Sequence, residues 1–99
     1  MTNASSNKLS NRQLTNAVEI VNLYLKYRNS FNYGHQKFII WRNLIKFITG
    51  ISDTKIIRKI FYHLLNKKQF HKYKKINSTY YIYNPTNKKL IIKDKVYFD

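Results

Sequence analysis

The chain of 99 residues contains no cysteine, only four acidic residues, two glycines and one proline. Without cysteine, neither a disulfide framework nor a zinc site with thiolate ligands can stabilise the fold, so packing must do so. No apolar run approaches the ~18 residues of a membrane-spanning helix. The polar residues 1–9 also lack the apolar stretch of a secretory signal. We therefore expect an intracellular protein, in the cytoplasm, the nucleus or a virion, with no membrane partner.

The scarcity of acids leaves the chain strongly basic. Nineteen Lys and Arg residues give a formal net charge of +15 and a pI near 10.1. Such a surface attracts polyanions, so the expected partner is a nucleic acid. Apolar residues still make up 43% of the chain, which is enough for a packed core. Because the length suits one domain, we predict a flexible tail over residues 1–9 and a single domain over residues 10–99.

The groups that usually perform catalysis or bind metals are dispersed. The acids form no cluster: Glu19, Asp53, Asp94 and Asp99. The histidines show no metal-ligand spacing: His35, His63 and His71. No nucleophile with a neighbouring base can be located, so we predict no metal, no cofactor and no enzymatic activity. Asp53 is interpreted as compensation of the helix dipole in a first turn.

The segment from Ser10 to Arg28 has the period of an amphipathic helix. Ser10 is the expected N-cap, Gln13 completes a capping box, and Leu9 and Leu14 occupy hydrophobic-staple positions. The apolar residues that recur every three or four positions are Leu14, Ala17, Val18, Val21, Tyr24 and Leu25. This spacing predicts one buried stripe along the helix.

A second helix is predicted after a turn. Residues 29–35 are turn-like, and Gly34 can adopt a positive φ. An apolar period then runs over residues 36–49. A strand over residues 37–41 is a minor alternative, but the length of the periodic segment favours a helix.

A glycine separates the second helix from a third. Gly50 stands where a helix C-terminus prefers glycine, and Ser52 is the expected N-cap of a helix over residues 53–66, with Ile51 and Ile56 as its staple. Its apolar residues are expected to be buried: Ile56, Ile57, Ile60, Phe61, Leu64 and Leu65. Its outer face is formed by Thr54, Lys55, Arg58, Lys59, Tyr62 and His63.

After the third helix the pattern changes to short runs rich in Tyr and Ile. QFHKYKKI over residues 69–76 and TYYIY over residues 79–83 predict a β-hairpin with its tip at Asn77-Ser78. A turn over residues 84–87 ends the hairpin. Further short strands are predicted over residues 90–92 and 96–98.

Three helices, the last two joined by a tight turn containing Gly50, followed by a basic hairpin, resemble the winged helix-turn-helix superfamily of DNA-binding domains. The resemblance covers most of residues 10–84 and is closest over ISDTKIIRKIFYHLLNKKQFHKYKKINSTYYIYNP. It implies an α+β fold, a three-helix winged helix-turn-helix with a C-terminal β-hairpin wing. The glycine that usually follows the third helix is replaced here by Asn66-Lys67-Lys68.

The resemblance also implies that the third helix enters a major groove while the wing follows phosphates or a minor groove. The residues expected to contact DNA are Thr54, Lys55, Arg58, Lys59, Tyr62, Lys72, Lys74, Lys75 and Asn77. Arg58 can offer a bidentate fork to guanine, and Lys55 and Lys59 lie one turn apart on the same side. The alternative is that these charges are only the solvated face of an amphipathic helix.

The aromatic residues of the hairpin have two interpretations. If exposed, the hairpin tyrosines would form a base-stacking platform for single strands. If packed on the helices, they belong to the core, as is usual in a small sheet. The tyrosines concerned are Tyr73, Tyr80, Tyr81 and Tyr83. Trp41, in the middle of the second helix, is expected in the core.

Three functions remain open at this point. The first is binding of double-stranded DNA by a transcriptional regulator, or by an accessory factor of replication or transcription, of viral or mobile-element origin. The second is an RNA-binding component of a ribonucleoprotein. The third is a winged helix that binds a protein partner in a transcription assembly. A homodimer through the first helix or the C-terminal strands is also open, and it would imply a palindromic site.

Overall fold

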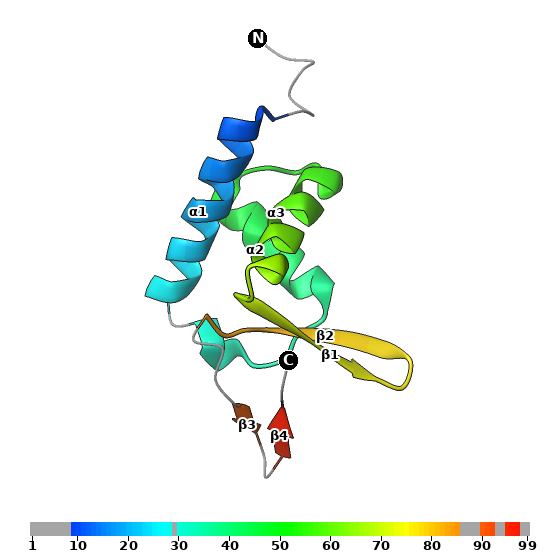
Figure 1. Ribbon diagram of the computed structural model, residues 1–99. Helices are drawn as coiled ribbons and strands as arrows, with labels where there is room; N and C mark the ends of the chain where they lie inside the picture. Colours follow the sequence, from blue (N-terminus) through cyan, green and yellow to red (C-terminus); the bar gives the residue numbers. More distant parts are fainter. Residues whose placement is uncertain (1–8, 29, 86–89, 93–94, 98–99) are drawn as a thin grey trace.

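The computed structural model describes residues 9–28, 30–85, 90–92 and 95–97 (Figure 1). Within these residues, three helices are followed by an antiparallel hairpin, an α+β layout consistent with a winged helix, as predicted. The helices are α1 (Asn11–Tyr27), α2 (Phe38–Thr49) and α3 (Thr54–Asn66), with a 3-10 turn, η2 (Ser30–Tyr33), after α1. The predicted flexible tail lies outside the described residues except for Leu9.

The start of α1 agrees with its sequence signals. The Ser10 hydroxyl accepts a hydrogen bond from the Gln13 backbone N–H at 3.1 Å, and Gln13 Oε1 accepts one from the Ser10 N–H at 2.9 Å. This reciprocal pair is the predicted capping box. Leu9 and Leu14 both pack against the core. Residues close together in the sequence therefore determine where α1 begins, and α1 in turn packs against α2 and α3.

Of the two predictions made for the turn between α2 and α3, one is confirmed and one is wrong. Gly50 ends α2 with φ at +74°, the left-handed conformation that favours glycine. The N-cap of α3, however, is Asp53 and not Ser52. The Asp53 carboxylate accepts a hydrogen bond from the Lys55 N–H at 2.8 Å. Asp53 therefore satisfies a free donor at the helix N-terminus, in addition to compensating the dipole there.

The end of α3 explains how the chain turns into the hairpin without a glycine. The N–H of Gln69 donates to the Leu64 carbonyl at 2.9 Å, and that of Lys68 donates to the Leu65 carbonyl at 3.1 Å. These two bonds form a Schellman motif, whose second-last residue usually is a left-handed glycine. Lys68 takes that place with φ at +65°.

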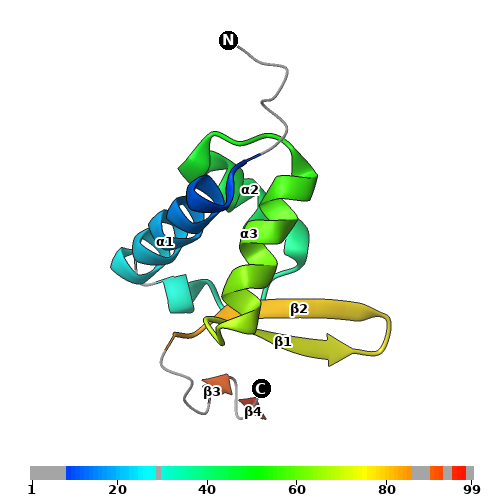
Figure 2. The ribbon, with the colours of Figure 1, turned by 45° about the horizontal axis from the view of Figure 1, so that its top comes forward.

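The hairpin consists of β1 (Phe70–Lys75) and β2 (Ser78–Tyr83), and Figure 2 shows it projecting beyond the helices. Lys75 pairs with Ser78, so the two-residue tip is Ile76-Asn77. The prediction of Asn77-Ser78 was therefore wrong by one residue. The base of the hairpin is buried on both faces, with Phe70 and Tyr81 on one face and His71 and Ile82 on the other, and this packing sets the register that places Ile76 rather than Ser78 in the tip.

The base of the hairpin is tied to the helices by a third extended segment. Gln36, just before α2, bridges β2 through two backbone hydrogen bonds with Tyr81, each 2.8 Å long. The Trp41 indole N–H also donates to the Tyr81 carbonyl, at 2.9 Å. The hairpin is thus fixed at Tyr81 by both the segment before α2 and the middle of α2.

The core lies between the three helices and the base of the hairpin. Its fully buried centre is aromatic: Phe61 lies 4.5 Å from Phe70 and 4.8 Å from Tyr81, and Trp41 lies 4.8 Å from Phe70, between ring centroids. Val18, Val21 and Leu25 add the buried side of α1. The core positions expected on α3 are confirmed, with Leu65 only partly buried.

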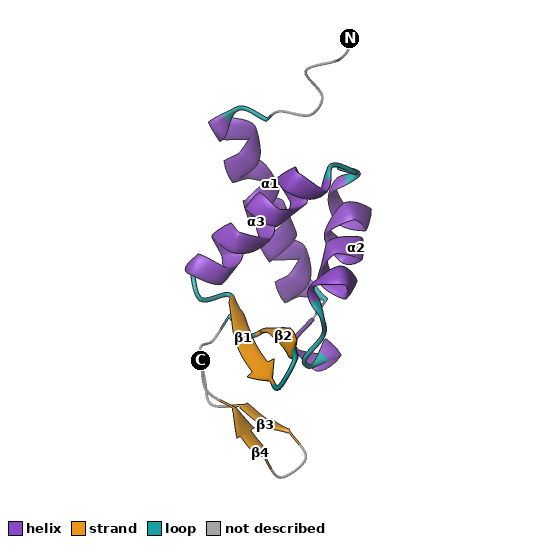
Figure 3. Ribbon diagram, turned by 90° about the vertical axis from the view of Figure 1, so that its right-hand side faces the viewer, coloured by secondary structure: helices purple, strands orange, loops and turns teal. Residues whose placement is uncertain are grey.

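Two smaller strands follow near the C-terminus. β3 (Leu90–Ile92) and β4 (Lys95–Tyr97) pair antiparallel in a separate sheet, shown below the hairpin in Figure 3. The predicted strand pair is confirmed, one residue earlier in its second half. Among the helices of the described residues, none is both long and apolar enough to cross a bilayer.

Candidate nucleic-acid interface

The outer face of α3 is basic because its apolar residues all turn inward. Ile56, Ile60 and Leu64 are buried, and they fall on the opposite side of the helix from the predicted DNA-binding residues. Lys55, Lys59 and Tyr62 are exposed and follow one another at spacings of four and three residues, so they form one line along the helix. Arg58 and Thr54 flank this line on one side, Arg58 exposed and Thr54 half-buried.

Arg58 is held by an aromatic ring of the neighbouring helix. Its guanidinium lies over Phe38, the first residue of α2, with Cζ 4.5 Å from the ring centroid. Phe38 in turn packs edge-on against Phe61 of α3, with 5.1 Å between centroids. A cation over a ring face at this distance is attracted by the ring quadrupole. The Arg58 side chain is therefore restrained, although it is exposed to solvent.

The outer face of α3 meets the hairpin at Tyr81. Tyr81 is buried against Phe61, and burial raises the pKa of its phenol. The neighbouring Tyr62 raises this pKa further, whereas the charge of Arg58 lowers it. The rings of Tyr62 and Tyr81 both lie against that of Phe61, with 5.7 Å and 4.8 Å between centroids. The line of polar residues on α3 therefore continues onto β2.

The two faces of the hairpin differ in what they carry. Side chains alternate along a strand, so Lys72 and Lys74 share the face of Phe70, which packs against α3. Across the strands, Lys72 pairs with Tyr81 and Lys74 pairs with Thr79. This hairpin face is therefore the one that joins the outer face of α3.

Two of the predicted wing residues lie elsewhere. Lys75 is exposed on the opposite face of the hairpin, the face that also carries Tyr73. Asn77 lies in the exposed tip, next to Ile76. The structure thus places Lys72 and Lys74 on the hairpin face that packs against α3, whose outer face carries Lys55, Arg58, Lys59 and Tyr62. It separates Lys75 from them by the thickness of the hairpin.

The combined surface carries charge of one sign. No acidic residue occurs between Asp53 and Asp94 in the sequence, a stretch that includes α3 and the whole hairpin. We name the outer face of α3 and the adjoining hairpin face the basic surface, formed by Lys55, Arg58, Lys59, Tyr62, Lys72 and Lys74. Its ammonium groups can neutralise phosphates, and the planar fork of Arg58 can bind a base edge or a phosphate through two hydrogen bonds.

The alternating tyrosines are divided between the core and a second face. Tyr81 and Tyr83 are buried, which agrees with their packing on the helices. Tyr73 and Tyr80 face each other across the strands on the opposite face and are half-buried, with His35 edge-on to Tyr73 at 5.6 Å between centroids. A stacking platform made of all four tyrosines is therefore excluded. Trp41 is in the core, as predicted.

Some contributors to this surface were missed in the sequence. No local sequence pattern indicates that the ring of Phe38 supports Arg58. Asn66 extends the line from Lys55 through Lys59 and Tyr62 by one more turn and is exposed. That residue could have been found, because helical spacing alone places it there.

The described residues contain no group of three or more His, Asp or Glu side chains arranged to hold a metal ion. The chain was also compared with protein families, curated proteins and solved structures. None of the three comparisons finds a match.

Proposed function

We propose that this protein binds double-stranded DNA through the basic surface, as a member of the winged helix-turn-helix superfamily. The observation that carries the proposal is the junction at Phe61. Its ring lies 4.8 Å from that of Tyr81 on β2 and 5.1 Å from that of Phe38, over which Arg58 lies, so the outer face of α3 adjoins one face of the hairpin. A helix and a projecting hairpin that share one cationic face suit a major groove and its flanking phosphates.

The residues of the basic surface would have two different roles in DNA binding. Lys55, Lys59, Lys72 and Lys74 bind phosphates, which provides affinity that depends on salt but not on sequence. Arg58 reads a base edge, preferably the O6 and N7 atoms of guanine. Its contact with Phe38 restrains the side chain before binding, so less conformational entropy is lost when the contact to the base forms.

The proposed role is non-catalytic and intracellular. A small binding domain of this kind serves as a transcriptional regulator or as an accessory factor of replication or transcription. The composition, rich in Asn, Lys, Ile and Tyr, is that of an A+T-rich genome and favours a viral or mobile-element source.

The test compares neighbouring lysines that lie on opposite faces of the hairpin. On any duplex, Lys74→Ala should weaken binding and reduce the magnitude of the salt slope by about one. Lys75→Ala removes the same charge from the other face, so it should change the slope less. Equal slopes for the two variants would show that the hairpin face does not determine the contact.

Arg58→Ala tests the reading of bases separately. It should cost roughly 1 to 3 kcal/mol on a duplex selected for tight binding, and much less on a scrambled duplex. Equal losses on both would reduce Arg58 to a phosphate contact. If none of the three variants affects binding, the basic surface is not the DNA site.

Two other ligands share this chemistry and are distinguished by competition. Double-stranded RNA presents a deep, narrow major groove that an α-helix does not enter, so we expect it to compete weakly with duplex DNA. Equal competition by RNA would favour a ribonucleoprotein component. Weak binding of every nucleic acid would favour a protein partner in a transcription assembly.

A further inference from the structure

Helix α1 has a second apolar face, which no other described element covers. Ile20, Leu23 and Tyr27 are 55%, 60% and 87% exposed, whereas Val18 and Leu25 are buried on the other side of the helix. Figures 1 and 2 show α1 at the edge of the helical group. The exposed residues share one stripe, because they are spaced by three and four positions.

The stripe has the spacing of a coiled-coil seam. Asn16, Ile20, Leu23 and Tyr27 follow one another at intervals of four, three and four residues, which is the spacing of alternating d and a positions of a heptad. A helix that carries apolar residues on opposite faces normally has both faces covered. The seam is thus built to pack against another helix.

The charges beside the seam are complementary to those of a second copy of this chain. Glu19 and Lys26 each precede a seam residue and lie one heptad apart on the same flank, at g positions. Within the described part of the chain, Glu19 makes no ion pair, and Asp53 is used as a helix cap. The flank therefore carries one charge of each sign that can pair with an identical flank.

We propose that two copies of this protein associate through an antiparallel pairing of their α1 helices. In such a pair, a positions face d positions, so Ile20 packs on the partner's Leu23 and Asn16 packs on the partner's Tyr27. The g positions of the two helices lie side by side in this arrangement. Glu19 of each copy then meets the partner's Lys26, and the two-fold axis repeats both pairs.

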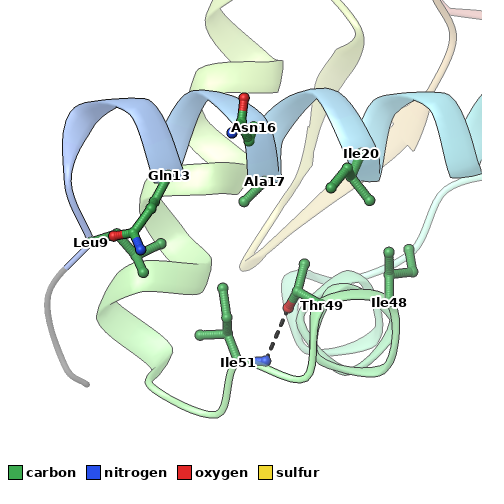
Figure 4. Close-up of a pocket in the computed structure, with 8 residues that line it drawn as sticks. All are labelled: Leu9, Gln13, Asn16, Ala17, Ile20, Ile48, Thr49 and Ile51. Carbon is green, nitrogen blue, oxygen red and sulfur yellow. Dashed lines mark hydrogen bonds between the residues drawn. The ribbon is translucent and has the colours of Figure 1, made fainter. Parts of the chain in front are cut away.

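A hollow at one end of the seam fits this arrangement. It lies between α1 and the turn that follows α2, and Figure 4 shows Asn16, Ala17 and Ile20 on one wall opposite Ile48 and Ile51. The antiparallel register places the partner's Tyr27 beside Asn16, at the mouth of this hollow. An aromatic ring there would cover apolar side chains that are now open to solvent.

The net charge of the chain opposes self-association, so the salt concentration determines whether the dimer is observed. Two chains of +15 repel each other at low salt, and the contact involves a single helix from each copy. Above physiological ionic strength the Debye length falls below ~8 Å, so this long-range repulsion is screened whereas apolar packing persists. We expect the dimer to strengthen as salt is raised.

The association leaves the basic surface free. The seam lies on the side of α1 opposite the buried Val18 and Leu25, so each pair carries two copies of the basic surface on one particle. The pairing does not depend on DNA binding and is tested without DNA.

The test uses sedimentation equilibrium at 0.15 M and at 0.5 M salt, with circular dichroism as the control for folding. The higher concentration screens the net charge, and the lower one preserves the ion pairs that the variants change. The wild-type chain should reach twice the mass of 12.0 kDa at concentrations of tens to hundreds of micromolar. Glu19→Lys and Lys26→Glu should each weaken self-association, because each places like charges opposite one another. An equal mixture of these two variants should dimerise, since the lysine introduced into one chain would face the glutamate introduced into the other. The double variant, carrying both exchanges, should dimerise by itself.

Several outcomes would overturn the proposal. A parallel pair would not bring Glu19 near Lys26, so the mixture would then show no recovery. A dimer that persists in the folded Leu23→Asp variant would use another face. A wild-type chain that is monomeric at all concentrations would mean that α1 is not a dimer interface, as when a segment of its own chain covers the seam.

Discussion

The guanidinium of Arg58 lies over the ring of Phe38, with 4.5 Å between Cζ and the ring centroid. This contact joins the outer face of α3 to the start of α2, the two helices of the proposed helix-turn-helix. Arg58 differs in this respect from the lysines of α3, for which the described residues provide no comparable ring.

Phe38→Leu should weaken binding to a preferred DNA site by roughly 0.5 to 1 kcal/mol, because the ring that restrains Arg58 is lost. Phe38→Tyr retains the ring face and should bind like the wild type. The measurement is equilibrium binding to a selected duplex, with thermal melting to correct for any loss of the contact between Phe38 and Phe61. If Phe38→Leu has the same effect in an Arg58→Ala background, the ring does not act through Arg58.

Tyr83 connects the base of the hairpin to α1, and its removal should destabilise the fold. Its hydroxyl donates to Asn22 Oδ1 at 2.5 Å and lies 3.1 Å from the Asn22 carbonyl oxygen. Tyr83→Phe should lower the free energy of unfolding at pH 7 by about 0.5 to 1.5 kcal/mol. Chemical denaturation measures this directly, and Tyr27→Phe, at an exposed tyrosine, is the control.

The same variant reveals a pH dependence. Burial raises the pKa of Tyr83 above its ordinary value of 10.0, so the folded state favours the neutral phenol. The stabilisation by Tyr83 is therefore complete below pH 10 and is lost as the pH rises above it, because the unfolded chain ionises first. The difference in stability between wild type and Tyr83→Phe should shrink above pH 10. A constant difference would contradict the raised pKa.

Lys68→Gly should stabilise the protein. Lys68 has φ at +65°, a conformation that costs a side chain with a Cβ atom about 1 kcal/mol and glycine almost nothing. Allowing for the greater entropy of glycine in the unfolded chain, we expect a gain of roughly 0.5 kcal/mol. Lys67→Gly is the matched control, since Lys67 has φ at −85° and its replacement by glycine should be destabilising.

Ile60→Ala and Leu64→Ala should each cost roughly 2 to 5 kcal/mol, since both side chains are fully buried in the only core of the described residues. Such a loss is a large share of the stability of a small domain. Lys59→Ala, on the exposed side of α3, should change stability by less than about 0.5 kcal/mol. Thermal unfolding of all three variants tests the orientation of the helix.

The amino-acid sequence by itself determined the three helices, the hairpin and the basic character of the outer face of α3. Capping boxes, a glycine after a helix and apolar periodicity depend on residues only a few positions apart, so they can be recognised before any fold is known. The misplaced N-cap of α3 illustrates the limit of such signals, because Ser52 and Asp53 are both good caps and neighbouring signals differ by one residue.

Only the tertiary structure decided which of the basic residues share a surface. The hairpin register follows from burial of Phe70 and Tyr81 against α3, and a shift by one residue would exchange the faces of Lys74 and Lys75. The support of Arg58 by Phe38 likewise joins two helices. These features depend on contacts between residues far apart in the chain. The free energies of such contacts cannot be read from any local sequence pattern.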